Sequence, residues 1–158
     1  MNLILSAREI GASDLPRVGG KALALAALSQ AGFRIPDFLC VTTDAYRAFL
    51  EGTGLRERIL LELHRKDFKE MRWEEIWDCA TRIRNLFLRK PLPPDVAAAL
   101  HAVVAERFGG QTVVVRSSAP DEDAASSSFA GLHESYVNIR GTEAVVEHIR
   151  RVWASLWS

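Results

Sequence analysis

A cationic side chain lies between an apolar run and a stretch of small residues in the second half of the chain. Three valines lead directly to Arg116, and two serines follow it. A β-branched run of this kind predicts a strand buried on both faces, with Arg116 at the edge of the core where the strand ends. A guanidinium beside flexible Ser/Gly backbone is the combination that polyphosphate binding requires. The residues also allow a structural interpretation, in which Arg116 forms an ion pair with Asp121, Glu122 or Asp123.

A second cation lies near the start of the chain, at the beginning of an apolar helical run. Lys21 follows Gly19 and Gly20, and the helical pattern continues to about Gln30. A helix start carries unpaired N–H groups and a partial positive charge, so it favours an anion. The motif is not a P-loop, because no Ser or Thr follows the lysine. Taken alone, the motif favours an ordinary helix start with a solvated lysine over an anion site.

Composition places the chain among ordinary globular domains. Its 158 residues are 48% hydrophobic and 25% charged, and 20 basic residues balance 20 acidic ones. This balance gives no reason to expect nucleic acid or an anionic membrane as a partner. No signal peptide or membrane-spanning stretch is visible, so the cytoplasm is the expected location. Cys40 and Cys79 are expected to be buried free thiols, and the four histidines show no metal-type spacing.

The expected elements are short strands separated by helices. Strands are predicted over residues 2–5, 38–41, 113–115 and 134–139, a loop over residues 11–20, and helices over residues 20–30, about 43–50, and most of 55–108. Within the last region, Trp73 and Trp77 are expected to pack in the core rather than stack on bases. The sequence therefore predicts an α+β fold, rich in helix, with a small sheet.

The final helix, which follows Gly141, has a broad apolar face that continues to Trp157. A face of this size is expected to need a cover. This observation predicts that the chain is either a fragment of a longer polypeptide or the binding partner of another chain.

Several of these segments together resemble one known family. They occur in order over nearly the whole chain, although the helical region 55–108 contributes little. The resemblance is to the N-terminal region of phosphoenolpyruvate synthase, pyruvate phosphate dikinase and rifampicin phosphotransferase. It is carried by Val18-Gly19-Gly20-Lys21, Ala31-Gly32-Phe33-Arg34-Ile35-Pro36, Val41-Thr42-Thr43-Asp44-Ala45-Tyr46, Val115-Arg116-Ser117-Ser118-Ala119, Ser128-Phe129-Ala130-Gly131, Tyr136-Val137-Asn138-Ile139-Arg140-Gly141 and Trp153-Ala154-Ser155-Leu156-Trp157.

The resemblance implies the first subdomain of an ATP-grasp-type nucleotide-binding fold, with residues 1–158 forming a single partial domain and a helical insert at about 55–108. It implies that Lys21 and Arg116 contact the phosphates of ATP, with Arg116 in the catalytic role. It also implies that Gly131 belongs to a loop closing over the nucleotide and that Ser135 lies near the phosphates. The sequence departs from the family pattern at Ala22, Leu23 and Ala24, at Pro120, and at Leu132 and His133.

By the same resemblance, the parent protein would be a phosphotransferase that moves phosphate from ATP to a histidine and onward to a pyruvate-like acceptor. The Mg2+ ligands, the remaining ATP-grasp half and the phosphohistidine domain would lie outside these residues. The chain alone is therefore expected to have little or no turnover. The alternative is a non-catalytic truncated interaction module that docks a partner through its C-terminal helix face. A purely architectural similarity is a third interpretation, which the matching exposed polar residues disfavour.

Overall fold

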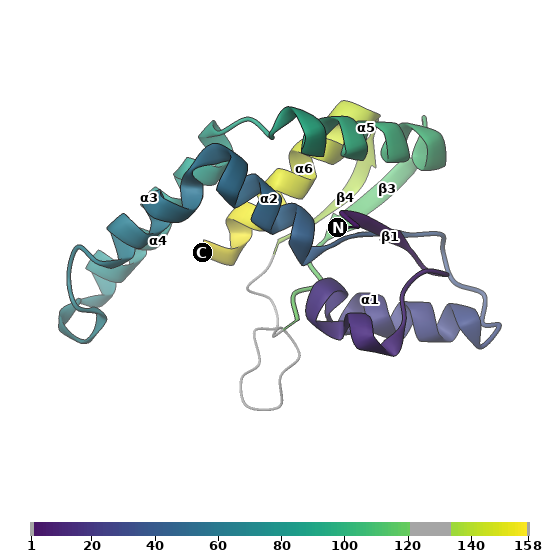
Figure 1. Ribbon diagram of the computed structural model, residues 1–158, viewed down its shortest axis with the longest axis horizontal. Coiled ribbons are helices and arrows are strands. Elements are labelled where there is room, and N and C mark those ends of the chain that lie inside the picture. The colour runs from purple at the N-terminus through teal and green to yellow at the C-terminus, as the bar shows by residue number, and fades with distance from the viewer. Residues whose placement is uncertain (1, 121–133, 158) are drawn as a thin grey trace. The chain divides into compact units, whose positions relative to one another are not determined.

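A computed structural model describes residues 2–120 and 134–157 of the chain. The fold is α+β, and the described residues form two compact units (Figure 1). The first unit takes its residues from Met1–Arg47 and Ser118–Gly131, and the second from Ala48–Ser117 and Leu132–Ser158. Helix α2 (Thr43–Thr53) belongs to the first unit up to Arg47 and to the second unit from Ala48.

In the first unit, a long helix packs on a two-stranded sheet. Strands β1 (Ile4–Ser6) and β2 (Leu39–Val41) are antiparallel, with Leu5 opposite Cys40. The short 3-10 helix η1 (Ala12–Asp14) leads into α1 (Leu15–Gln30). Alternate strand residues face the helix, so the core of this unit is small and apolar. It consists of Leu5, Ile10, Val18, Ala22, Ala26 and Cys40, with Leu23 and Phe38 packed against them.

Helix α1 is two helical segments joined at a kink. Gly19 has φ 77° and ψ 167°, a conformation outside the helical region that glycine adopts without a steric penalty. The segment after the kink begins at Gly20, as the sequence predicted. The expectation of a loop over residues 11–20 is wrong for its second half, because Leu15 already begins a helical turn with Pro16 in its first positions, where proline is well tolerated.

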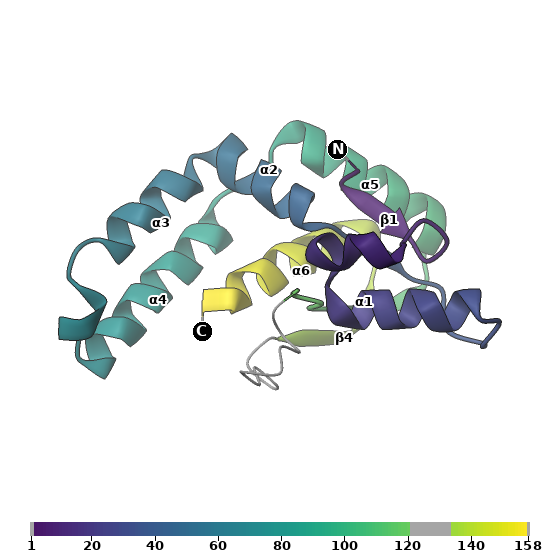
Figure 2. The same cartoon turned by 60° about the horizontal axis from the view of Figure 1, so that its bottom comes forward.

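The second unit contains the predicted helical region. Helices α3 (Leu55–Leu63) and α4 (Trp73–Arg89) lie side by side, joined through the 3-10 helix η2 (Phe68–Glu70), and α5 (Pro94–Phe108) follows (Figure 2). Ile83 and Phe87 of α4 are fully buried, in line with the helical spacing. The expectation that Trp73 and Trp77 pack in the core is wrong, because they are 73% and 62% exposed. They lie beside the buried stripe of α4 rather than within it.

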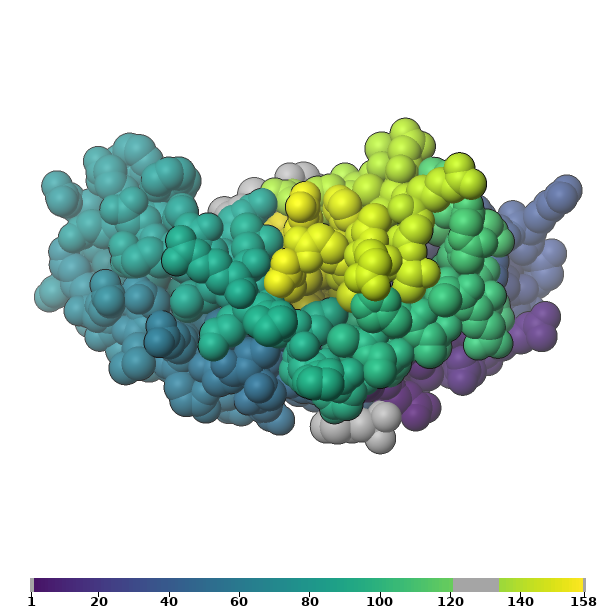
Figure 3. All heavy atoms as spheres, turned by 90° about the horizontal axis from the view of Figure 1, so that it is seen from above, coloured from purple at the N-terminus to yellow at the C-terminus, as the bar shows by residue number. Residues whose placement is uncertain are grey.

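Helix α6 (Thr142–Ala154), followed by the 3-10 helix η3 (Ser155–Trp157), is the centre of the second unit. It contacts α4, α5 and both strands of the second sheet, and Figure 3 shows it against α5. The ring of Trp153 stacks on Phe49, with 5.3 Å between centroids. The apolar face expected to need a cover from elsewhere is therefore largely covered within this unit. Its buried members are Val145, Val146, Ile149, Val152 and Trp153.

Strands β3 (Thr112–Arg116) and β4 (Ser135–Arg140) form an antiparallel two-stranded sheet with one face on α6. Val113 and Val115 are half-buried, whereas Val114 is 57% exposed. The expectation that the valine strand is buried on both faces is wrong, because α6 covers one face and Val114 points to the other.

Candidate functional site

Two of the predicted site residues lie opposite each other on the two paired strands of the second sheet. Arg116, the last residue of β3, lies opposite Ser135, the first residue of β4. Directly opposed residues of an antiparallel pair project to the same face, with their Cβ atoms about 5 Å apart. Both residues are exposed, and this face is opposite the one that packs on α6. The strand pairing therefore places a guanidinium and a hydroxyl together at one end of an open sheet face.

An irregularity in the sheet sets this register. Val113 pairs with Ile139 but Val115 pairs with Tyr136, so β4 has one extra residue between these pairs. Asn138 lies in this bulge with φ 58°, the left-handed region that asparagine tolerates better than other residues with a side chain. The bulge allows Tyr136 and Ile139 both to face α6, and it leaves Ser135 on the open face with Arg116.

The second serine after Arg116 is bound to the start of the Lys21 helix. The Ser118 hydroxyl accepts a hydrogen bond from the backbone N–H of Ala22 (2.9 Å) and donates one to the carbonyl of Val18 (2.7 Å). The Ala22 N–H is one of those that a capping side chain usually satisfies. The helical segment starts after Gly19, which has no side chain, so Ser118 supplies the capping hydroxyl from a distant part of the chain.

Gly19 makes this contact possible. A Cβ built on Gly19 would lie 1.8 Å from the carbonyl oxygen of Ser118 and 2.5 Å from its carbonyl carbon. Real Cβ atoms essentially never come within 3.0 Å of another heavy atom in this way. Two independent requirements, a positive φ and the close approach of Ser118, therefore specify glycine at this position.

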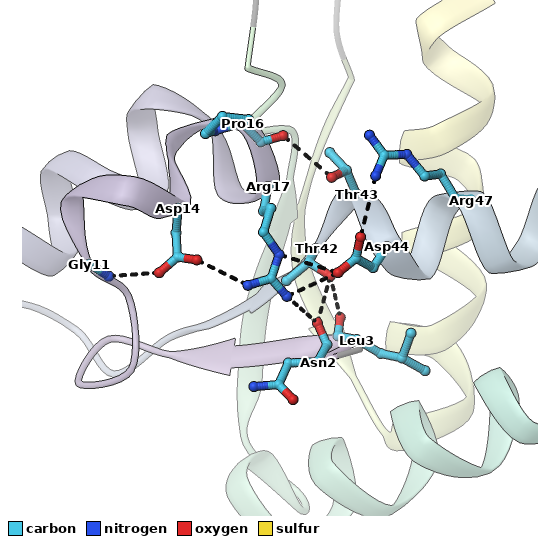
Figure 4. Close-up of polar contacts among 10 residues, drawn as sticks. All are labelled: Asn2, Leu3, Gly11, Asp14, Pro16, Arg17, Thr42, Thr43, Asp44 and Arg47. Atoms are coloured by element: carbon cyan, nitrogen blue, oxygen red, sulfur yellow. Dashed lines mark hydrogen bonds and ion pairs between the residues drawn. The ribbon is translucent and has the colours of Figure 1, made fainter.

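The segment that leads to Gly19 is held by a polar cluster around Arg17 (Figure 4). Its guanidinium donates to Asp44 at 3.0 and 3.2 Å, to Asp14 at 3.0 Å and to the carbonyl of Asn2 at 3.2 Å. The hydrogen bond to Asp44 raises the pKa of Arg17 above its usual value, so the charge is permanent. The backbone N–H of Gly11 lowers the pKa of Asp14. The cluster joins the first turn of α1 to β1 and to the start of α2.

The structure brings some of the predicted residues together and leaves others separate. Arg116 and Ser135 meet in the second unit, while Lys21 lies in the first unit, at the helix start bound by Ser118. The convergence of Lys21 and Arg116 on one ligand therefore stays a prediction. Gly131 lies outside the described residues, as do the three acidic residues of the alternative ion pair. No carboxylate within residues 2–120 and 134–157 forms an ion pair with Arg116.

Sequence reasoning treated Ser117 and Ser118 as flexible backbone and missed the capping role of Ser118. A signal for it was present in the sequence. Gly19 occupies the position before a helix where a serine, threonine or aspartate is usual, so the cap had to come from elsewhere.

The described residues offer no ready metal site. No three His, Cys, Asp or Glu side chains among them cluster in a way that could hold a metal ion. We therefore assign no Mg2+ ligand to this part of the chain.

In the same part of the chain, no helix is both long and apolar enough to cross a membrane. Cys40 and Cys79 are free and buried, as predicted, and burial raises the pKa of the Cys40 thiol to about 12.

The arginine on the open sheet face of the second unit and the glycine-started helix of the first unit are the two features that the sequence analysis linked to anion binding. Comparison with known families shows to which family of domains the chain belongs. Residues 15–158 match the family described as the pyruvate phosphate dikinase, AMP/ATP-binding domain. The chain belongs to this family, which confirms the resemblance read from the motifs.

Curated relatives include two kinds of enzyme. A rifampicin phosphotransferase from a Streptomyces species is 37% identical over 99% of this chain, and a phosphoenolpyruvate synthase from Aeropyrum pernix is 39% identical over 99%. A phosphoenolpyruvate synthase from Neisseria meningitidis is 36% identical over the same share. The chain covers 18%, 20% and 21% of these relatives' lengths, so it spans about a fifth of each.

Proposed function

We propose that this chain binds ATP through its triphosphate, with Arg116, Ser135 and Lys21 as phosphate-binding residues. The observation that carries the proposal is the pairing of Arg116 with Ser135 on the open face of the second sheet. No carboxylate among the described residues pairs with this guanidinium, whose planar set of donors matches phosphate oxygens. Membership of an AMP/ATP-binding family identifies the phosphate compound as a nucleotide.

The Lys21 helix start supports the same proposal from the first unit. Its N–H groups and partial positive charge favour an anion, and the lysine ammonium adds a full charge there. Ser118 binds this helix start and lies only two residues after Arg116 in the sequence. In the proposed complex, Lys21 and Arg116 would neutralise the phosphate chain. Arg116 would also stabilise the charge that builds up on the phosphoryl group during transfer.

We further propose that the chain is the nucleotide-binding part of a longer phosphotransferase, which passes phosphate from ATP to a histidine and then to an acceptor. The relatives' lengths support additional domains. In this proposal they are the second ATP-grasp half and a phosphohistidine domain. Mg2+, when bound, would neutralise phosphate charge, and its ligands would lie in those domains. The two free thiols fit a cytoplasmic location. An interaction module without catalysis is the less favoured alternative, because the helix face it would use is largely buried.

The test is calorimetric titration of ATP with Mg2+ into the wild-type chain and the Arg116→Met variant. A charge-assisted bidentate contact contributes about 1.5–3 kcal/mol, so we expect affinity to fall by about tenfold or more. Arg140→Met is the matched control, because Arg140 lies in the same sheet but at its other end, opposite Thr112. Equal ATP affinity in the wild type and in Arg116→Met would overturn the proposal.

A further inference from the structure

Glu134, the residue immediately before Ser135, is held by groups from three separate segments. Arg84 of α4 donates to one carboxylate oxygen at 2.6 Å, and the hydroxyl of Tyr136 donates to the other. The backbone N–H of Glu134 donates to the hydroxyl of Ser155 at 3.3 Å. We call Arg84, Tyr136 and Ser155 the Glu134 clamp.

We propose that the Glu134 clamp positions Ser135, and with it Arg116, for binding the phosphates of ATP. This inference rests on the proposed function, because it concerns the same site. Arg84 is then a positioning residue: it acts on the ligand only through Glu134 and the strand that begins next to it. No sequence motif singled out Arg84 or Glu134 for this role.

The clamp controls which way Ser135 points. Along a strand, successive side chains project to opposite faces. Tyr136 packs edge-on against the His148 ring of α6, with 4.7 Å between centroids, so its side of the strand is the covered one. Glu134 shares that side, where Arg84 reaches it. Holding Glu134 and Tyr136 on the covered side leaves Ser135 on the open side, opposite Arg116.

Ser155 fixes the same point through the backbone. Its side chain is almost fully buried and also donates to the carbonyl of Val152 at 2.7 Å, so the hydroxyl has little freedom. Ser155 belongs to the Trp153–Trp157 segment, which carries part of the family resemblance in the sequence. That segment contributes no residue to the proposed nucleotide site. The clamp gives that segment a role, because η3, which follows α6, holds the residue that precedes β4.

The arrangement matters energetically because Glu134 directly precedes β4, a strand that pairs with one neighbour, β3, in the part of the chain that the structure describes. The side chains of Arg84 and Glu134 are 28% and 37% exposed, so their attraction is less screened than that of a fully exposed pair. Without Arg84, the carboxylate loses one of its two partners and the end of β4 can fray. A phosphate contact is sensitive to displacements of about 1 Å, so fraying there weakens binding before it unfolds the domain.

The experiment compares two arginines of the same helix. Arg82 also forms a tertiary ion pair, but its partner is Glu62 of α3, at 2.8 Å, and not Glu134. We expect Arg84→Met to weaken the affinity for Mg-ATP about fivefold, in the range typical of coupled network residues, and Arg82→Met to leave it unchanged. Arg84→Lys, which retains the charge, should recover part of the affinity. Affinity is measured by calorimetry, and the melting temperature of each variant shows how much general stability is lost.

The amide signal of Ser135 in a nitrogen-15 NMR spectrum provides a readout that a merely structural role would not change. It should shift on adding ATP in the wild type and in Arg82→Met, and shift less at the same occupancy in Arg84→Met. If Arg84→Met does not fold, Glu134→Gln replaces it, since the amide keeps the shape and weakens only the charge. The same reduced affinity and reduced shift are expected.

The outcomes separate this inference from the function on which it rests. If Arg116→Met binds ATP as tightly as the wild type, the proposed function is wrong. If Arg116→Met loses affinity while folded Arg84→Met or Glu134→Gln binds like the wild type, the function stands and the positioning role is wrong. Equal losses in Arg84→Met and Arg82→Met would also overturn the positioning role, because they would reflect stability alone.

Discussion

The hydroxyl of Ser118 caps the backbone N–H of Ala22 at 2.9 Å, across 96 residues of sequence. The same hydroxyl donates to the carbonyl of Val18, so one side chain spans the kink in α1. Ser118, the last residue of the Arg-Ser-Ser motif, is therefore bonded to the start of the Gly-Gly-Lys helix within the first unit. Gly19 permits this contact because it has no side chain.

Replacing Gly19 by alanine should be strongly destabilising. The residue would be forced into a left-handed conformation, and its Cβ would overlap the Ser118 carbonyl. We expect the free energy of unfolding to fall by more than about 3 kcal/mol, from backbone strain plus steric overlap. The measurement is urea unfolding followed by circular dichroism. Gly32→Ala is the control, because Gly32 has φ 84° but open space around it, and it should cost only about 1–2 kcal/mol. Equal losses would show that the close approach to Ser118 is unimportant.

Replacing Ser118 by alanine should weaken both stability and nucleotide binding. The lost cap costs about 1 kcal/mol of unfolding free energy. The helix start then becomes free to move, so the affinity for Mg-ATP should also fall. Ser29→Ala is the matched control, because Ser29 lies on the same helix and its hydroxyl has no partner among residues 2–120 and 134–157. Wild-type affinity in folded Ser118→Ala would contradict a role for the cap in binding.

Much of the fold could be predicted because its signals are local. Glycine marked the C-terminal end of α1, proline marked the break before α5, and hydrophobic spacing identified α4 and α6. The errors concern tertiary environment. Three valines indicate a strand but not how many neighbours it has, and only the structure shows that Val114 faces away from α6. For the same reason, the pattern of α4 did not reveal how exposed Trp73 and Trp77 are.

The residues of the candidate site could be proposed from the sequence, whereas the contacts made around them could not. Arg116 and Ser135 were singled out from residue types and motif resemblance, and the strand register brings them together. The residues that hold them depend on contacts far apart in sequence, such as Arg84 with Glu134, separated by 50 residues. No single-sequence pattern encodes a pairing of this kind. Asn138 is an intermediate case, because asparagine inside an apparent strand indicates a bulge only once the register is known.

Glu75 should give the unfolding free energy a measurable dependence on pH in acid. The backbone N–H of Arg72 and then the Lys66 ammonium lower its pKa from 4.5 to about 2. Because the pKa is lower in the folded state, the ionised carboxylate contributes stability above about pH 4.5, and this contribution is lost as the pH falls towards about 2. The stability difference between the wild type and Glu75→Gln should therefore be largest at neutral pH and shrink in acid.

Urea unfolding between about pH 2 and pH 7 measures this difference directly. Glu74→Gln, which alters the neighbouring acidic residue in the same helical turn, is the control for a general change in charge. A difference between the wild type and Glu75→Gln that stays constant over this range would show that the Glu75 interactions do not stabilise the folded state.

Cys40 should be chemically inert as long as the first unit is folded. Its thiol is buried in the core, and burial raises its pKa to about 12, so almost none of the reactive thiolate is present near neutral pH. We expect no labelling of Cys40 by N-ethylmaleimide at pH 7 in the native chain and complete labelling in urea, as read by mass spectrometry of the peptides. Rapid labelling without denaturant would mean that this core opens readily.

The bulge at Asn138 should decide on which face of the sheet Ser135 lies. Tyr136 and Ile139 are three positions apart, so both face α6 only because the bulge takes up the extra residue between them. Asn138→Val disfavours the bulge, because a β-branched residue rarely adopts a φ of 58°. In a strand without the bulge, with Ile139 held against α6, strict alternation turns Ser135 to the covered face and away from Arg116.

We expect Asn138→Val to lose ATP affinity by about fivefold, measured by calorimetry, because one hydrogen bond contributes about 1 kcal/mol. Asn138→Gly is the control, because glycine adopts this φ without strain and keeps the bulge. Since Asn138→Gly should bind ATP like the wild type, a folded Asn138→Val variant that also binds normally would show that the opposition of Arg116 and Ser135 is not what the nucleotide recognises.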